Sequence, residues 1–165
     1  FFPSYSYMNQ VYERVDKEVP NIEFDCQWVG MTETEREDFL DAFDAEASVN
    51  RVAFATLGGI FSEGIDLRGE RLTGVIIVSV GLPQLCFERQ LIGNYFDQQG
   101  LSGYDYAYVF PGMNKVLQAG GRLIRTEEDF GDILLIDDRY LTGKYLRMFP
   151  KSWQKFNRLP RRQGV

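Results

Sequence analysis

The sequence predicts an α/β fold, with a mostly parallel sheet and helices on both of its faces. Short runs of β-branched and aliphatic residues alternate along the chain with segments in which apolar residues recur at helical spacing. Two of the runs, Val75–Val80 and Ile133–Ile136, are almost continuous, as is typical of strands buried on both faces. At 165 residues, the chain is long enough to bury one good core.

The first half of the chain should contain two helices and two strands. Apolar residues at helical spacing predict the first helix: Met8, Val11, Tyr12, Val15 and Val19. A short strand is expected over residues 23–29, and a second over residues 52–56. Between them, Thr32 and Glu35 have the spacing of a capping box, which predicts a helix beginning there. Three residues supply the apolar face of that helix: Phe39, Leu40 and Phe43.

The second half begins with a glycine-punctuated loop over residues 58–69, followed by the strand at 75–80. A helix is expected next, with the apolar residues Leu85, Leu91, Ile92, Tyr95 and Phe96. Pro111 suits the first position of a further helix, which we expect to run to about Arg125 before the strand at 133–136.

The start of the sequence resembles the end of a buried strand, because it reads Phe1-Phe2-Pro3 and has no initiator methionine. We therefore expect a piece of a longer protein. Residues 1–150 should form one domain, and residues 151–165 a basic tail. No apolar run approaches the roughly 18 residues of a membrane span, so we expect no membrane contact.

The composition excludes several kinds of site. Without histidine there is no Ser-His-Asp triad, no Cys-His pair and no histidine-bearing zinc site. Cys26 and Cys86 are too few for a four-cysteine metal site, and we expect both to serve apolar packing. No metal ligands are expected in this chain.

Charge is unevenly distributed along the chain. The net charge is −6, but residues 139–165 carry eight basic and no acidic side chains. The acidic balance speaks against a generally basic nucleic-acid coat. The basic segment is either a solvated tail or a contact for a polyanion, and the sequence leaves both open.

Two segments carry polar residues in patterns that point to chemistry. The first is the stretch from Gln118 to Arg125, in which Gln118, Arg122 and Arg125 would share one helix face at about 100° per residue. Two adjacent glycines in a helix cost about 1 kcal/mol each relative to alanine, which suggests a close approach to the backbone. Arginines beside such a gap suit phosphate oxygens. The alternative is an amphipathic helix with solvated arginines.

The second segment is the loop over residues 58–66, which follows a predicted strand. It combines three glycines with the carboxylates Glu63 and Asp66. Those groups could accept a ribose hydroxyl, a metal-bound water or an arginine, or the segment could be an ordinary surface turn. The sequence has no Gly-x-x-x-x-Gly-Lys-Ser/Thr loop, so any nucleotide site here would be half a site.

Taken together, these segments resemble the C-terminal motor domain of superfamily-2 DNA helicases of the XPD/DinG family. Residues 1–5 resemble the end of motif IV, residues 62–66 resemble motif V, and Gln118-x-x-Gly121-Arg122-x-x-Arg125 resembles motif VI. Asp137-Asp138-Arg139 resembles the family's Asp-x-Arg ending. The resemblance implies a RecA-like helicase C-terminal domain over residues 1–150, with a P-loop NTPase-like fold.

The resemblance also implies roles for individual residues. Arg125 would act as an arginine finger on ATP bound to a first motor domain, and Arg122 would assist it. The residues of the ATP half-site would be Glu63, Gly64, Asp66, Gln118 and Gly121. Ser4, Tyr5 and Ser62 would contact the DNA backbone.

The implied partners are single-stranded DNA, ATP and the N-terminal motor domain of the same chain, which would hold most of the ATP and Mg²⁺. The implied activity is 5′-to-3′ unwinding in DNA repair or replication, at the nucleoid in a bacterial cytoplasm. The sequence does not decide whether the parent protein holds an iron–sulfur cluster elsewhere. Two other readings remain: a non-enzymatic α/β module that binds a nucleotide or another anion, and an inactive motor-like domain.

Overall fold

Two pairs of parallel strands form the sheet in the computed structural model, which describes all residues except 20, 45, 47–48, 64–70, 125–128 and 161–165. Strand β1 (Ile22–Cys26) pairs with β2 (Asn50–Phe54), and β3 (Gly74–Val78) pairs with β4 (Asp132–Ile136). Both pairs are parallel, which confirms the predicted strand direction.

The first two residues join the two pairs of strands. Phe2 donates its N–H to the Ala55 carbonyl at 2.9 Å and accepts from the Leu57 N–H at 2.8 Å. On the other side, the Phe1 ammonium donates to the Ile76 carbonyl at 2.6 Å, and the Val78 N–H donates to the Phe1 carbonyl at 2.9 Å. Both sets follow the slanted pattern of parallel strands. Residues 1–2 therefore lie between β2 and β3, as their resemblance to a buried strand predicted.

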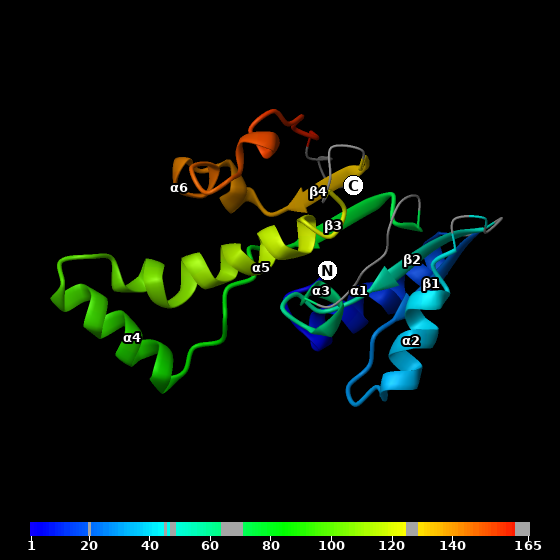
Figure 1. Cartoon of the computed structure of the whole chain (residues 1–165), viewed down its shortest axis with the longest axis horizontal. Helices are drawn as coiled ribbons and strands as arrows, with labels where there is room; N and C mark the ends of the chain where they lie inside the picture. Colours follow the sequence, from blue (N-terminus) through cyan, green and yellow to red (C-terminus); the bar gives the residue numbers. More distant parts are fainter. Residues whose placement is uncertain (20, 45, 47–48, 64–70, 125–128, 161–165) are drawn as a thin grey trace.

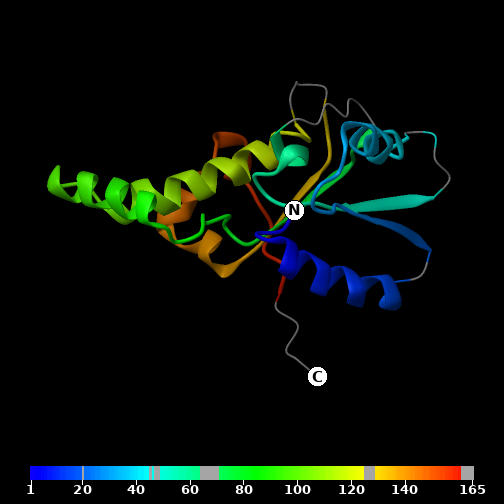
Figure 2. The ribbon, with the colours of Figure 1, turned by 90° about the horizontal axis from the view of Figure 1, so that it is seen from below.

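Helices cover both faces of the half of the sheet that contains β1 and β2 (Figure 2). Helix α1 (Tyr5–Glu18) packs through Met8 against Phe2 and Phe54 on one face. Helices α2 (Glu33–Asp41) and α3 (Ile60–Glu63) pack through Phe39 and Phe61 against Ala55 on the other. The predicted arrangement of helices on both faces is therefore confirmed for this half.

The capping box predicted at the start of α2 is also present. The Thr32 hydroxyl accepts from the Glu35 N–H at 3.3 Å, and the Glu35 carboxylate accepts from the Thr32 N–H at 2.7 Å. This reciprocal pair satisfies two N–H groups that the helix itself leaves unpaired.

The half that contains β3 and β4 is covered mainly on one face. Val75 and Ile77 are buried against α5 (Phe110–Gly120), whereas Ile76 and Ile136 are 47% and 49% exposed. The expectation that residues 75–80 are buried on both faces is therefore wrong for Ile76, and the expectation of a buried strand at 133–136 is wrong for Ile136. Helix α4 (Phe87–Gln98) packs against the turn over Asp105–Val109, which precedes α5, and projects away from the sheet (Figure 1).

The chain beyond β4 closes over the same core as α5. It contains the short helix α6 (Gly143–Leu146) and two 3₁₀ turns, at Asp138–Leu141 and Lys151–Trp153. Earlier in the chain, a π-helical turn over Asp105–Val109 precedes α5. In the part of the chain that the structure describes, no helix combines the length and apolar character needed to cross a membrane.

Helix α5 ends earlier than the sequence predicted. Its last helical residue is Gly120, and the next residues form a tight turn in which Arg122 and Leu123 donate to the carbonyls of Ala119 and Gly120. Leu123 is thereby buried in the core beside Val116. Gln118 and Arg122 therefore do not share a helix face. The glycine pair favours this ending because glycine is a poor helix former and Leu123 gains burial.

The close approach inferred from the two glycines is made by the chain's own Trp153. A Cβ atom on Gly120 would lie 2.3 Å from Cη2 of the Trp153 indole, so only glycine leaves room for the ring. Trp153 also contacts Phe149 in the core. Gly120 is therefore explained by packing, and residues as far as Trp153 pack against the domain.

We predict that Gly120→Ala destabilises the domain by about 1–3 kcal/mol, because the added methyl group overpacks a filled site. Chemical denaturation measures this change. Gly143→Ala is the matched control, because a Cβ there meets no atom within 4 Å. Equal stability of the two variants would contradict the packing account.

We also predict a pH dependence for a polypeptide that starts at Phe1. Burial lowers the pKa of its α-ammonium from 8.0 to about 5. Between these values the unfolded chain binds a proton and the folded chain does not, so stability falls as the pH drops from 8 to 5, by at most about 4 kcal/mol. Denaturation of the free and N-acetylated chains across this range tests it. The stability of the acetylated chain should not fall in this way. If the stabilities of the two chains change with pH in the same way, the prediction is wrong.

Candidate functional site

Two of the three predicted DNA-contacting residues, Ser4 and Tyr5, lie with other polar residues at one edge of the sheet, where the strands end. Parallel strands end at the same edge, where open α/β sheets bind their ligands. The residues that follow each strand, in the order of the strands across the sheet, are Gln27, Thr56, Ser4 with Tyr5, Ser79, and Asp137.

A buried glutamine connects three of these strand ends. Gln27 is only 4% exposed, and its Oε1 accepts from the Thr56 N–H at 2.9 Å and from the Thr56 hydroxyl at 3.2 Å. Its Nε2 donates to the Tyr5 hydroxyl oxygen at 2.8 Å. Because Tyr5 accepts this bond, its own hydroxyl proton stays available to an acceptor outside the chain.

Ser4 lies beside Tyr5 at the start of α1. Its hydroxyl oxygen accepts from the Tyr7 N–H at 3.3 Å, so Ser4 is the N-cap of the helix. The side chain is exposed. The structure thus brings Ser4 and Tyr5 together on the edge of the sheet, with their oxygens fixed by bonds within the chain.

Sequence reasoning missed Gln27 and Thr56. Both lie within segments predicted as strands, at residues 23–29 and 52–56. Their sequence position could have indicated them, because each is a polar residue near the end of a predicted strand. Such a residue is buried only when it is hydrogen-bonded, so it often belongs to a specific network.

The segments that resemble motifs V and VI also lie together. Arg122, just beyond α5, donates from Nε to the Ser62 carbonyl at 3.0 Å, across 60 residues of sequence. Helices α3 and α5 pack against each other at this point. Gln118 and Gly121 are exposed beside them, and Arg122 is half-buried.

Ser62 differs from the expectation of a direct DNA contact. It is fully buried, at 0% exposure, and its hydroxyl donates to the Gly59 carbonyl at 2.9 Å. It holds the turn between β2 and α3 instead of presenting its hydroxyl to a strand. Arg125, Gly64 and Asp66 lie outside the described residues, as does the side chain of Glu63.

Lys115 is a basic residue at this edge that sequence reasoning missed. Its side chain extends from α5 over Gly58, and a Cβ at Gly58 would lie 2.7 Å from the Lys115 Cε. Gly58 also has a φ of +75°, which favours glycine. The loop after β2 is therefore shaped to leave room for this cationic side chain.

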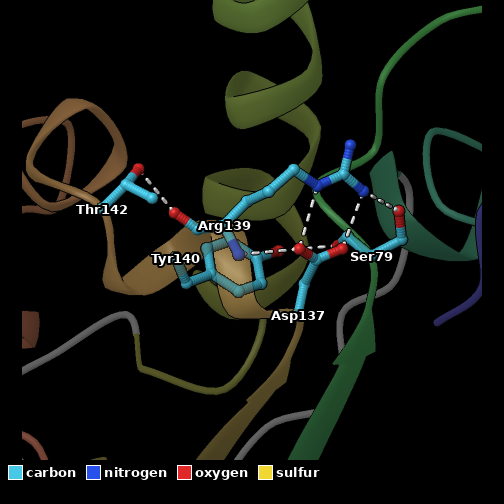
Figure 3. A network of polar contacts seen from close by, with 5 residues as sticks. All are labelled: Ser79, Asp137, Arg139, Tyr140 and Thr142. Atoms are coloured by element: carbon cyan, nitrogen blue, oxygen red, sulfur yellow. Dashed lines mark hydrogen bonds and ion pairs between the residues drawn. The ribbon is translucent and has the colours of Figure 1, made fainter.

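The Asp-x-Arg segment forms a network with the end of β3 (Figure 3). Arg139 donates through Nε and Nη2 to the two oxygens of Asp137, at 2.9 and 2.7 Å, and Nη2 also donates to the Ser79 hydroxyl oxygen at 3.2 Å. The Arg139 guanidinium lowers the pKa of Asp137, so the carboxylate stays ionised at neutral pH.

Within the described residues, no three acidic or cysteine side chains gather in a geometry that could hold a metal ion. Cys26 is half-buried, and burial raises the pKa of its thiol. Cys86 is exposed at the N-cap of α4, so the expectation of buried packing is wrong for this residue.

Comparisons with known proteins identify the relationship. The family model described as the helicase C-terminal domain matches residues 1–156. The chain is similar to the ATP-dependent DNA helicase DinG of Photobacterium profundum, with 33% identity over 103 residues, covering 61% of this chain and 15% of the relative. It is also similar to the 3′-5′ exonuclease DinG of Staphylococcus saprophyticus, with 27% identity over 94% of this chain and 16% of the relative.

A probable ATP-dependent helicase of Methanocaldococcus jannaschii is 31% identical over 68% of this chain and 20% of its own length. The chain thus spans between 15% and 20% of the length of these relatives. A solved structure of an XPD helicase matches the fold with a TM-score of 0.68 at 22% identity, covering 88% of this chain and 25% of that one. The mixed α/β, RecA-like fold is thereby shown. The chain belongs to the helicase C-terminal domain family, as the C-terminal domain of an XPD/DinG-type helicase.

Proposed function

We propose that this chain is part of an ATP-dependent DNA helicase, to which it supplies the arginine-finger half of the ATP site and part of the single-stranded DNA track. The observation that carries the proposal is the family match over residues 1–156, which includes all the motif-like segments. The structure supports it by joining the segments that resemble motifs V and VI through the Arg122–Ser62 bond.

The ATP half-site would lie around α3 and the end of α5. Arg125 would stabilise the negative charge that develops on the phosphoryl group during transfer, and Arg122, held by Ser62, would orient this segment. ATP with Mg²⁺ would supply the phosphoryl group, and the N-terminal motor domain would hold most of it. Gln118 and Gly121 are exposed where that domain would close, and Glu63, Gly64 and Asp66 would complete this side.

The DNA track would follow the edge where the strands end. Tyr5 and Ser4 present hydroxyl groups there, and Lys115 adds a cation. Hydroxyl groups contact phosphates without reading bases, which suits a motor that moves along any sequence. Ser62 supports the loop from beneath.

Alternating closure and opening of the two motor domains would move the protein along one strand. We propose 5′-to-3′ movement in DNA repair or replication, and a cytoplasmic location at the nucleoid, from the family resemblance alone.

In the full-length protein, Arg125→Ala should lower DNA-stimulated ATP hydrolysis by about 10³-fold or more, the effect of losing an arginine finger. Single-stranded DNA binding should persist. Steady-state ATPase assays measure this, with Arg14→Ala as a control because Arg14 is an exposed residue of α1 paired with Glu18. Near-normal ATP hydrolysis by the Arg125 variant would show that Arg125 is not an arginine finger. Tight ATP binding by the isolated chain would instead favour an anion-binding module.

Tyr5→Phe should weaken binding of single-stranded DNA roughly fivefold, which corresponds to one hydrogen bond of about 1 kcal/mol. Gln27→Leu should have at least the same effect, because it frees the Tyr5 ring and leaves the Thr56 N–H unpaired. Fluorescence anisotropy with a labelled oligonucleotide measures the affinity. The matched control is Tyr7→Phe, because Tyr7 is an exposed tyrosine of the same helix, two residues further along. If Tyr5→Phe binds as tightly as the control, Tyr5 does not contact the strand.

A further inference from the structure

Ser79 has a backbone conformation that non-glycine residues rarely adopt. It directly follows β3 and has a φ of +73°, in the left-handed region. Serine is not among the residues that tolerate this region best. A conformation of this kind persists only where the surroundings over-determine it, and such residues gather at binding and catalytic sites.

Three hydrogen bonds hold Ser79 in this conformation. Its N–H donates to the Ile136 carbonyl at 3.0 Å, which continues the pairing of β3 with β4. Its carbonyl accepts from the Tyr140 hydroxyl at 2.7 Å, and its hydroxyl oxygen accepts from Arg139 Nη2 at 3.2 Å. The backbone and the side chain of Ser79 are therefore both fixed from the β4 side (Figure 3).

The residues that hold Ser79 are themselves constrained. Tyr140 is 3% exposed, and burial raises the pKa of its phenol, so it remains a proton donor. Asp137 accepts two hydrogen bonds from the Arg139 guanidinium. These two bonds fix the direction of the third, which Arg139 donates to Ser79. Because Asp137 neutralises Arg139, this network positions a hydroxyl group more than it concentrates positive charge.

The geometry leaves the Ser79 hydroxyl with a proton to donate. Its oxygen already accepts from Arg139, and among the described residues it donates to no acceptor. Tyr5 is in the same state, because its oxygen accepts from Gln27. Both residues follow neighbouring strands, since Val78 pairs with Phe1. Two oriented hydroxyl donors thus lie at the same edge of the sheet.

We propose that Ser79 contacts a backbone phosphate of the single strand, and that Arg139, Asp137 and Tyr140 are positioning residues for it. This inference rests on the proposed function and extends the track from Tyr5 across the end of β3. Each hydroxyl group can still donate a hydrogen bond, and a phosphate oxygen would accept it. The contact is neutral, so it releases no counterion and should leave the salt dependence of binding unchanged.

The experiment measures binding of labelled oligo-dT to the full-length protein at several salt concentrations. Ser79→Ala and Ser79→Gly should each weaken binding roughly fivefold, with the same slope of log affinity against log salt as the wild type. Glycine accepts the φ of +73° without strain, so the Gly variant excludes a folding defect as the cause. Ser152→Ala, which removes an exposed hydroxyl on the turn at Lys151–Trp153, is the control.

A double-mutant cycle tests the positioning role. Arg139→Gln should weaken binding in the wild type but have no further effect in the Ser79→Ala background, because it acts through that hydroxyl. Additive losses would overturn the positioning role. If the wild type binds and both Ser79 variants bind equally well, the Ser79 contact is refuted while the helicase proposal stands. If the wild type binds no single-stranded DNA, both fail.

Discussion

The pairing of Phe1 and Phe2 between β2 and β3 is the interaction on which the rest of the structure depends. Without it the chain contains two separate pairs of strands, each too small to be stable alone. The two side chains also connect the cores, because Phe1 packs against the clusters around α2 and α5 while Phe2 belongs to the cluster under α1. The same pairing places Ser4 and Tyr5 between the ends of β2 and β3, so the edge of the sheet becomes one continuous surface.

Hydroxyl groups and the motif VI-like arginine Arg122 lie in two different regions of the domain. Hydroxyl groups lie where the strands end, each oriented by a buried or paired partner such as Gln27 or Arg139. Arg122, in the segment that resembles motif VI, follows α5 and lies next to the turn that Ser62 holds. Helix α5 spans both regions, because Lys115 reaches the loop after β2 and Arg122 follows its last turn. The proposed track in this chain, whose net charge is −6, would therefore depend on oriented donors more than on positive charge.

The sequence predicted the approximate positions of the strands, their parallel direction and the capping box, because these depend on local patterns. It did not predict where α5 ends, because that depends on Leu123 entering the core and on Trp153, far along the chain, filling the space beside Gly120. It treated Ser62 as a contact, although long-range packing buries it. Gln27, Ser79 and Tyr140 were missed for the same reason: each acts through a partner between 22 and 61 residues away in sequence.

In the proposed complex, one strand of DNA crosses the edge of the sheet at Tyr5 and Ser79, while Arg125 faces the nucleotide. A structure of the full-length protein with single-stranded DNA and a non-hydrolysable ATP analogue tests this directly. We expect phosphate oxygens within hydrogen-bonding distance of the Tyr5 and Ser79 hydroxyl groups, and the Arg125 guanidinium at the γ-phosphate. A strand that passes over another face of this domain, or an Arg125 side chain directed away from the nucleotide, would contradict it.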